Sequence, residues 1–177
     1  NFNVNEVLAN RALEILGYAR GNYDIINPLD DVNKFQSTND VIPTASRLAV
    51  IYSLKELEKQ IENLQRALQD KEQVFAGIIK SGRTQYQAAV PVSLGMEFGA
   101  WAEAIARDRW RVYKSFERIK VLNIGGTAVG TGITAPRKYI FRVIDKLRSI
   151  SGLGVARAEN LVERSEERRV GKECMPV

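Results

Sequence analysis

Three small polar side chains stand in a row at Ser37, Thr38 and Asn39. Two hydroxyls and an amide can donate hydrogen bonds to carboxylate oxygens without bringing a charge. The apolar pattern of a long helix follows soon afterwards, and backbone N–H groups at a helix start are unpaired and carry positive partial charge. The segment therefore predicts a pocket for an anion. These residue types also cap helices, so a purely structural role stays open at this point.

A glycine-rich segment between residues 123 and 136 is a second stretch that could bind a ligand. Its glycines allow positive φ angles and a close approach of the backbone, and they stand at Gly125, Gly126, Gly130 and Gly132. Backbone N–H groups in such a loop can surround an anion. The same composition also suits a tight link between two packed helices, and the residues leave both interpretations open.

The residues that the chain lacks exclude several kinds of site. It has no histidine, which rules out a Ser-His-Asp triad and any histidine-ligated metal within the chain. Its one cysteine, Cys174, cannot form an intrachain disulfide, and this fits a reducing compartment such as the cytoplasm. No GxxxxGK[ST] phosphate loop is present.

Composition indicates an ordinary globular domain. The chain has 177 residues, 45% of them hydrophobic and 27% charged. No stretch approaches the roughly 18 apolar residues that a membrane span needs, so we expect no membrane partner. The formal charge of +5 is spread along helical faces. We interpret it as solvated surface rather than a nucleic-acid site.

Apolar residues at helical spacing predict helices over residues 3–16, about 43–80, about 93–122 and about 136–150. A hairpin-like extended excursion is expected near residues 82–92, between the two longest helices. The first of these two carries a heptad-like stripe at Leu54, Leu57, Ile61, Leu64 and Leu68. A rod of about 55 Å cannot bury such a stripe within so short a chain. We therefore expect partner helices from this chain and from other subunits.

Four motifs in order resemble the aspartase/fumarase superfamily over residues 1–163. They are Val4–Asn10, Gln36–Asp40, Gly82–Gln85 and Gly125–Gly132. The aspartate ammonia-lyase branch is the most similar. Fumarases typically carry Ser-Ser-Asn at 37–39 and histidine where this chain has Gln85.

The resemblance implies an all-α fold with long antiparallel helices in a central bundle shared by four subunits. Residues 1–36 would end the N-terminal domain, and residues 37–163 would form part of the bundle domain. The implied reaction is the reversible anti-elimination of ammonia from L-aspartate to give fumarate. It needs no metal and no organic cofactor. A homotetramer is expected, with each active site built from three subunits.

The resemblance also assigns roles to individual residues. Ser37 and Thr38 would donate hydrogen bonds to the β-carboxylate of the substrate, and Asn39 would hold its amino group. Thr84 and Gln85 would contact the amino group or the α-carboxylate. Removing the β-proton makes that carboxylate a doubly charged aci-carboxylate, which such donors stabilise. For Arg83 we expect a structural ion pair rather than a substrate contact.

The resemblance implies two further parts of the site that this sequence does not contain, an upstream Gly-Thr-Ser segment and a downstream loop. The serine base and the lysine that grips the α-carboxylate belong to a downstream loop, so no catalytic residue is assigned within the chain. We expect the 177-residue chain to be inactive alone. Residues 164–177 depart from the family pattern and resemble the translation of a sequencing adapter. We interpret them as a non-native tail.

Two alternatives remain open. A class II fumarase-type hydratase would use the same scaffold with water in place of ammonia. A non-catalytic helical scaffold, as in the crystallin relatives, would keep the fold and lose the chemistry. Retention of the uncharged donors Ser37, Thr38 and Asn39 with Thr84 and Gln85 favours the lyase, because a scaffold has no need of them.

Overall fold

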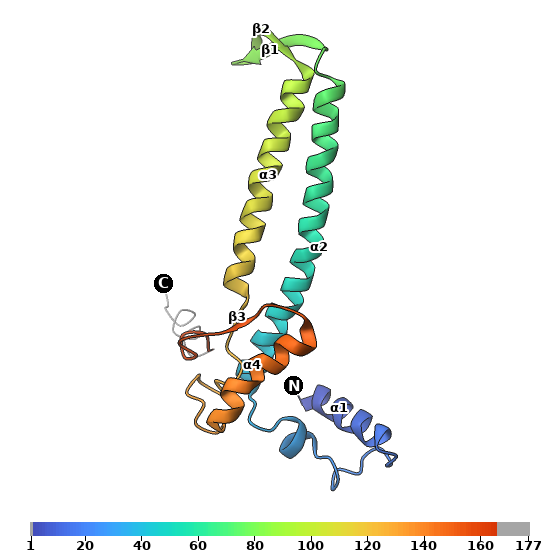
Figure 1. The fold of residues 1–177 in the computed structure, drawn as a ribbon, viewed down its shortest axis with the longest axis vertical. Coiled ribbons are helices and arrows are strands. Elements are labelled where there is room, and N and C mark those ends of the chain that lie inside the picture. Colours follow the sequence, from blue (N-terminus) through green and yellow to red (C-terminus); the bar gives the residue numbers. More distant parts are fainter. Residues whose placement is uncertain (1, 166–177) are drawn as a thin grey trace. The chain divides into compact units, whose positions relative to one another are not determined.

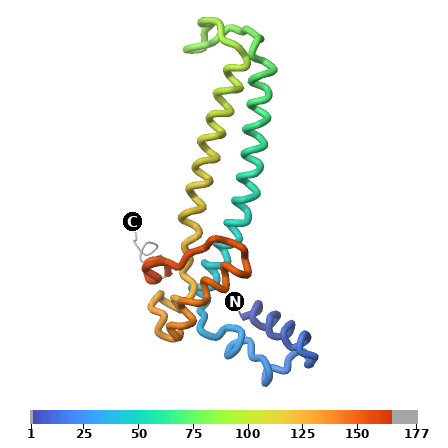
Figure 2. Tube along the Cα trace, viewed as in Figure 1, coloured from blue at the N-terminus to red at the C-terminus, as the bar shows by residue number. Residues whose placement is uncertain are grey.

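The computed structural model describes residues 2–165, so most of the predicted non-native tail lies outside the described residues. The element order is α1 (Phe2–Ile15), the π-helix η1 (Pro28–Val32), α2 (Thr38–Val74), β1 (Ile79–Thr84), β2 (Gln87–Ser93), α3 (Leu94–Ile119), β3 (Val121–Leu122), α4 (Arg137–Ser151) and β4 (Ala156–Arg157). Figures 1 and 2 show this order along the chain. The fold is mostly helical as predicted, and it also contains two small sheets. The β1–β2 pair falls in the predicted excursion, whereas the short parallel pair β3–β4 was not predicted.

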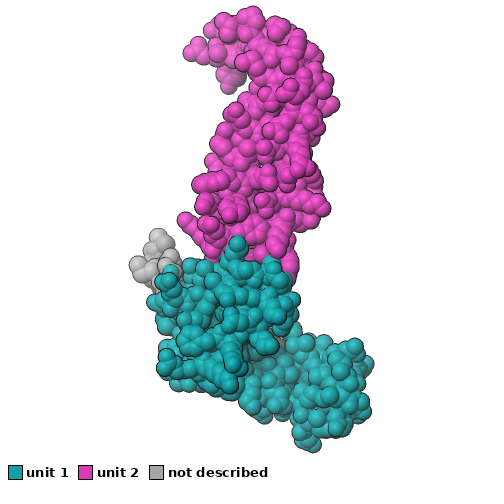
Figure 3. Space-filling view, in the orientation of Figure 1, with its two compact units in different colours: residues 1–49, 120–177 teal, residues 50–119 magenta. Residues whose placement is uncertain are grey.

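The chain divides into two compact units, coloured separately in Figure 3. One contains residues 1–49 and 120–177, and the other contains residues 50–119. The predicted boundary between residues 36 and 37 divides the N-terminal domain from the bundle domain of the family, and it stays a prediction.

The unit of residues 50–119 is a helical hairpin made from most of α2 and all of α3. The two helices run antiparallel, since Gly95 lies against Glu72 and Ala76 while Arg109 lies 3.5 Å from Glu62. Gly95 is buried, and a Cβ there would meet the Glu72 carbonyl oxygen at 2.5 Å. Glycine therefore lets the two helices approach closely at this end of the hairpin.

The predicted excursion near residues 82–92 is confirmed as the antiparallel pair β1–β2. Thr84 pairs with Gln87, which leaves a two-residue turn at Gln85 and Tyr86. The register shifts between Ser81 and Arg83, and a Cβ on Gly82 would lie 2.7 Å from the Val90 carbonyl oxygen. Glycine is thus required at this bulge by close backbone approach.

Helix α1 buries a different stripe from the one that apolar spacing within residues 3–16 predicts, which is Val4, Val7, Leu8, Ala12, Ile15 and Leu16. Asn5, Ala9 and Leu13 are buried, and Asn5 donates a hydrogen bond to Asn33 at 3.1 Å. Most of the predicted apolar face is exposed, including Val4, Val7, Leu8, Ile15 and Leu16. Apolar character alone did not identify the buried face, because no described residue covers those side chains.

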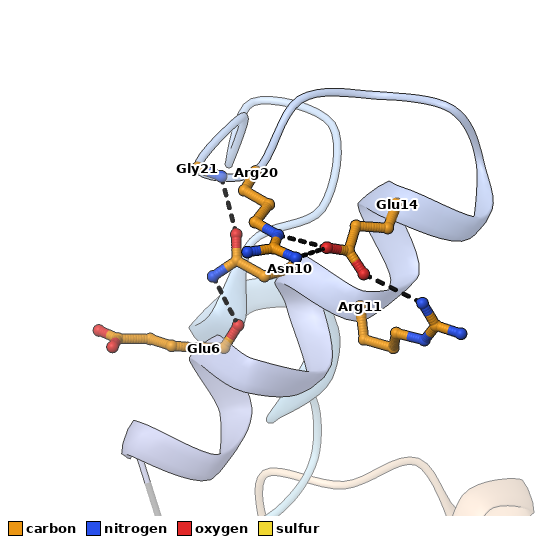
Figure 4. Close-up of polar contacts among 6 residues, drawn as sticks. All are labelled: Glu6, Asn10, Arg11, Glu14, Arg20 and Gly21. Carbon is orange, nitrogen blue, oxygen red and sulfur yellow. Dashed lines mark hydrogen bonds and ion pairs between the residues drawn. The ribbon is translucent and has the colours of Figure 1, made fainter.

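A polar cluster closes the loop that follows α1 (Figure 4). Asn10 accepts a hydrogen bond from the Gly21 N–H at 2.7 Å and donates to the Glu6 carbonyl at 3.0 Å. Glu14 forms ion pairs with Arg11 and Arg20. Asn10 therefore connects the helix to its own loop through side-chain hydrogen bonds.

The lengths of the longer helices differ from the prediction at both ends. α2 begins at Thr38 rather than near residue 43, and it ends at Val74 rather than near 80. α3 ends at Ile119 because Val121 and Leu122 leave the helix and pair in parallel with β4. α4 matches its expected range to within one residue and ends at Gly152, whose φ of 66° is left-handed.

Candidate functional site

The start of α2 is closed by a reciprocal cap between Ser37 and Asp40. Ser37 Oγ accepts a hydrogen bond from the Asn39 N–H at 3.2 Å. Asp40 Oδ1 accepts one from the Ser37 N–H at 2.9 Å. This is a capping box with aspartate in place of glutamate or glutamine. The capping role that the sequence left open for this segment is therefore confirmed.

The second carboxylate oxygen of Asp40 lies in the glycine-rich loop. Oδ2 accepts hydrogen bonds from the N–H groups of Gly125 at 3.2 Å and Thr127 at 3.0 Å. Both donors have positive φ angles, 92° and 58°, which turn their N–H groups inward. The loop therefore does surround an anion, and that anion is the protein's own carboxylate. The carboxylate also links the first turn of α2 to the segment before α4, while the binding of an external anion by this loop stays a prediction.

Pro43 shapes the same region by removing one helical hydrogen bond. It lies inside α2, and without an N–H it leaves the Asn39 carbonyl without its usual partner. Asn123 Nδ2 donates to this carbonyl at 3.1 Å, and Thr44 Oγ1 lies 3.5 Å from Asn123 Oδ1. Asn123 is almost fully buried. A proline deeper in the helix than expected is therefore tolerated, because a loop side chain replaces the missing donor.

These contacts form one connected network, which we call the polar junction and define as Asn39, Asp40, Asn123, Gly125 and Thr127. Its last link is the hydrogen bond from Asn39 Nδ2 to the Ala128 carbonyl at 2.9 Å. All of its members lie in the compact unit of residues 1–49 and 120–177. The network attaches the first turn of α2 to a loop more than eighty residues away in sequence.

Burial controls the ionisation of the two acidic groups at the junction. Desolvation raises the pKa of the Asp40 carboxyl above its ordinary value, and the N–H groups of Ser37, Thr127 and Gly125 oppose this rise. The pKa of Tyr139 is raised to about 12, first by burial and then by the Asp40 carboxylate, while the Gln36 side chain opposes the rise. The buried Tyr139 hydroxyl has no hydrogen bond of ordinary geometry among the described residues.

Thr38 differs from its neighbours in having all its donors free. It is exposed at the first position of α2, and no described residue pairs with its hydroxyl or its N–H. Ser37 and Asn39 are half-buried and partly engaged. The Ser37 oxygen accepts from the backbone, which leaves its proton available, and Asn39 keeps its amide oxygen available. The three predicted residues therefore lie together, with a hydroxyl proton available on Ser37, free donors on Thr38 and an acceptor oxygen on Asn39.

Thr84 and Gln85 lie in the other compact unit, at the turn of the β1–β2 hairpin. Both are exposed. Gln85 and Tyr86 have φ angles of 49° and 63°, as in a type I′ turn, although neither is glycine. Non-glycine residues held in this region are strained, and such strain often accompanies a functional role. That Thr84 and Gln85 bind the same substrate as residues 37–39 stays a prediction, because the two groups lie in different compact units.

Three residues of this region were not predicted from sequence as part of the site. Asp40, Asn123 and Tyr139 shape it from inside, and only Asp40 had a readable signal, the Ser-x-x-Asp spacing of a capping box. Arg83 is exposed and forms no ion pair with another described residue, so the structural ion pair expected for it stays a prediction.

An open hollow of about 370 Å³ lies between α2 and α3 in the unit of residues 50–119. It is lined by Glu58, Gln65, Ala106, Arg109, Trp110 and Tyr113. Arg109 is already balanced by Glu62 at 3.5 Å and Glu58 at 3.9 Å. None of the predicted binding residues lines this hollow.

Residues 2–165 also bear on two further features, a metal site and a membrane span. No cluster of three or more His, Cys, Asp or Glu side chains is placed to hold a metal ion within that range. None of the helices described there is long and apolar enough to cross a membrane.

Comparison with known proteins gives consistent matches. A sequence model of the lyase family matches residues 1–175. Aspartate ammonia-lyase from Corynebacterium glutamicum is 44% identical over 167 residues, covering 94% of this chain and 32% of that protein. The Bacillus subtilis aspartate ammonia-lyase is 43% identical, with 94% and 35% covered. The chain thus spans about a third of the length of these relatives. The family match continues past residue 163, and the non-native origin of the tail stays a prediction.

Solved structures agree with these sequence matches. A fumarate lyase:delta crystallin structure from Brucella melitensis has a TM-score of 0.88 at 47% identity, covering 91% of this chain and 35% of that one. A class II fumarase from Schistosoma mansoni has a TM-score of 0.79 at 30% identity, covering 92% and 37%.

Proposed function

Because the chain belongs to the lyase family, we propose that it forms part of an ammonia-lyase that converts L-aspartate to fumarate and ammonia. The relatives at 40–45% identity that support this substrate are named aspartate ammonia-lyases. This chain would supply residues that bind the substrate. The serine base belongs to a later part of the family's sequence.

The exposed, unpaired Thr38 at the start of α2 is the observation that supports this proposal most directly. Its hydroxyl and N–H, with the Ser37 hydroxyl proton, provide neutral donors beside the positive end of a long helix dipole. The charge of an aci-carboxylate develops on oxygen as the β-proton leaves. Fixed donors aimed at that oxygen lower the barrier without having to reorganise during the reaction.

The remaining groups suit the other end of the substrate. The Asn39 amide oxygen is an acceptor that an ammonium group can meet. Thr84 and Gln85 would reach the amino group or the α-carboxylate when copies of the protein assemble. In a homotetramer, several subunits would complete each site, and the reaction would need neither metal nor organic cofactor. We expect the assembly to work in the cytoplasm.

Assays of two proteins test the proposal. The protein from the complete reading frame that encodes this chain is incubated with aspartate, with fumarate plus ammonia, and with malate. The 177-residue chain alone is assayed in parallel. We expect fumarate absorbance to rise from aspartate with the first protein and not with the second. Activity on malate alone would make it a fumarase-type hydratase, and no activity on any substrate would favour a scaffold.

Thr38→Val tests the residue at the centre of the proposal. Valine keeps the shape and removes the hydroxyl, so the barrier should rise by about 2.7–4 kcal/mol if Thr38 stabilises the transition state. Ser149→Ala removes an exposed hydroxyl on α4 and serves as the matched control, with kcat unchanged. An unchanged rate for Thr38→Val would remove Thr38 from the site.

A further inference from the structure

The Asp40 carboxylate has all its contacts inside the protein. It is fully buried, and its two oxygens accept from Ser37 N–H on one side and from Gly125 and Thr127 N–H on the other. It therefore joins two backbone segments, the one that carries the predicted donors and the glycine-rich loop. The donors in the loop lie more than eighty residues from Asp40 in the sequence.

Backbone dipoles alone neutralise this charge. None of the ion pairs among residues 2–165 includes Asp40, and no described lysine or arginine donates a hydrogen bond to it. A buried carboxylate without a cation is retained only where fixed donors surround it. Such donors fix its position closely, because backbone N–H groups cannot rotate away as side chains do.

We propose that Asp40 is a positioning residue of the lyase, which holds Ser37, Thr38 and Asn39 in register for the substrate by occupying the anion cradle of the glycine-rich loop. This inference rests on the proposed function of residues 37–39. It also assigns the loop a role: the N–H groups of Gly125 and Thr127 serve the protein's own carboxylate rather than a substrate carboxylate. Asp40 itself does not touch substrate, since its side chain is fully buried.

Asp40→Asn is the informative substitution because it keeps the size of the side chain and changes one oxygen into an NH₂ group. With its oxygen toward the loop, the amide nitrogen faces the Ser37 N–H, and two donors oppose each other. With the reverse orientation, the Gly125 and Thr127 N–H groups lose their acceptor. Either way the segment that carries Thr38 shifts relative to the loop.

The experiment measures kcat and KM for aspartate in the protein from the complete reading frame. Asp40→Asn should lower kcat/KM by up to about 10²-fold, the scale expected for a misplacement of about 1 Å. Asp145→Asn removes an exposed carboxylate from the same compact unit and should leave both constants unchanged. Thr44→Val alters the buried contact to Asn123 without touching residues 37–39, and should affect unfolding more than catalysis.

A double-mutant cycle with Thr38→Val separates positioning from general loosening. If Asp40 acts through Thr38, the effect of Asp40→Asn on kcat/KM should largely disappear once the Thr38 hydroxyl is absent. Fully additive effects, or wild-type kcat/KM in Asp40→Asn, would overturn the inference. If Asp40→Asn does not fold, Asp40→Glu replaces it, since it keeps both oxygens on a longer arm. Wild-type kcat/KM in a folded Asp40→Glu would likewise overturn the inference.

Amide hydrogen exchange tests the contacts of Asp40 without relying on catalytic activity, so it separates this inference from the proposed function. The amides of Ser37, Gly125 and Thr127 should exchange slowly in the wild type and faster in Asp40→Asn. An inactive wild-type protein with this exchange pattern would overturn the proposed lyase function and leave Asp40 as the link between the segments. Fast exchange at all three amides in an active wild-type protein would overturn the positioning role instead.

Discussion

Two carboxylates of the same compact unit, Asp40 and Glu14, are held in opposite ways. Asp40 is fully buried and bound by three backbone N–H groups. Glu14 lies at the surface and pairs with the guanidinium groups of Arg11 and Arg20 (Figure 4). Burial raises the pKa of Asp40, whereas hydrogen bonds from Arg11 and then Arg20 lower the pKa of Glu14.

The two carboxylates differ in how rigidly they can hold the segments that they contact. Arginine side chains are long and mobile, and their pairs with exposed carboxylates contribute little to stability. Backbone donors are held by the fold itself, so a carboxylate among them fixes two segments against each other. The Asp40 network therefore suits a site that needs defined geometry, and the Glu14 cluster suits the closing of a surface loop.

The largest effect is expected from a glycine in the loop that holds Asp40. A Cβ on Gly130, which has a φ of 89°, would lie 2.5 Å from backbone atoms of Leu161 and Val162. Gly130→Ala should lower the free energy of unfolding by about 2–5 kcal/mol, from backbone strain and overpacking together. Gly21→Ala in the loop after α1 has open space around its Cβ and should cost only about 1–2 kcal/mol. Urea denaturation measures both, and equal losses would contradict the comparison.

Removing each carboxylate gives the next largest contrast. Asp40→Ala leaves three buried N–H groups without an acceptor and should destabilise the protein by about 2–4 kcal/mol. Glu14→Ala releases two exposed arginines to water and should lower the denaturation midpoint much less. The same urea titrations measure both variants. A larger loss of stability in Glu14→Ala than in Asp40→Ala would contradict the prediction that Asp40 contributes more to stability.

The two carboxylates should also give opposite pH dependences. For Asp40 the folded pKa lies above 3.8, so its contribution is present below that pH and is lost as pH rises through the folded pKa. For Glu14 the folded pKa lies below 4.5, so its contribution is present above that pH and is lost as pH falls. Unfolding free energies of the wild type, Asp40→Asn and Glu14→Gln across acidic pH measure both slopes. Two differences of the same sign would contradict this prediction.

Salt should produce the smallest difference. Ions screen the exposed pairs of Glu14, so the lowered pKa of Glu14 should move back toward 4.5 as salt increases. The pKa of Asp40 should respond less, because its donors are uncharged N–H groups in a buried site. NMR titration of the two carboxyl carbons at low and high salt measures both. An equal response would mean that solvent ions reach Asp40.

Local sequence patterns were sufficient for the elements whose signals lie within a few residues. The range of α4, the hairpin near residues 82–92 and the cap at Ser37 all depend on short-range spacing, turn residues and helix-start chemistry. The predicted start of α2 near residue 43 is too late, because proline favours the first turn of a helix and here lies deeper, in a helix that begins at Thr38. The donor that replaces the missing proline hydrogen comes from Asn123, eighty residues later.

The family, the helical character and the cluster of uncharged donors at Ser37, Thr38 and Asn39 could all be predicted from the amino-acid sequence. Residue type and spacing along the chain carry that information. That the glycine-rich loop binds Asp40, and that Thr38 stays free beside it, follows from the three-dimensional arrangement of the segments. An anion cradle is formed by backbone N–H groups that any residue possesses, so the partner that fills it depends on which segments the fold brings together.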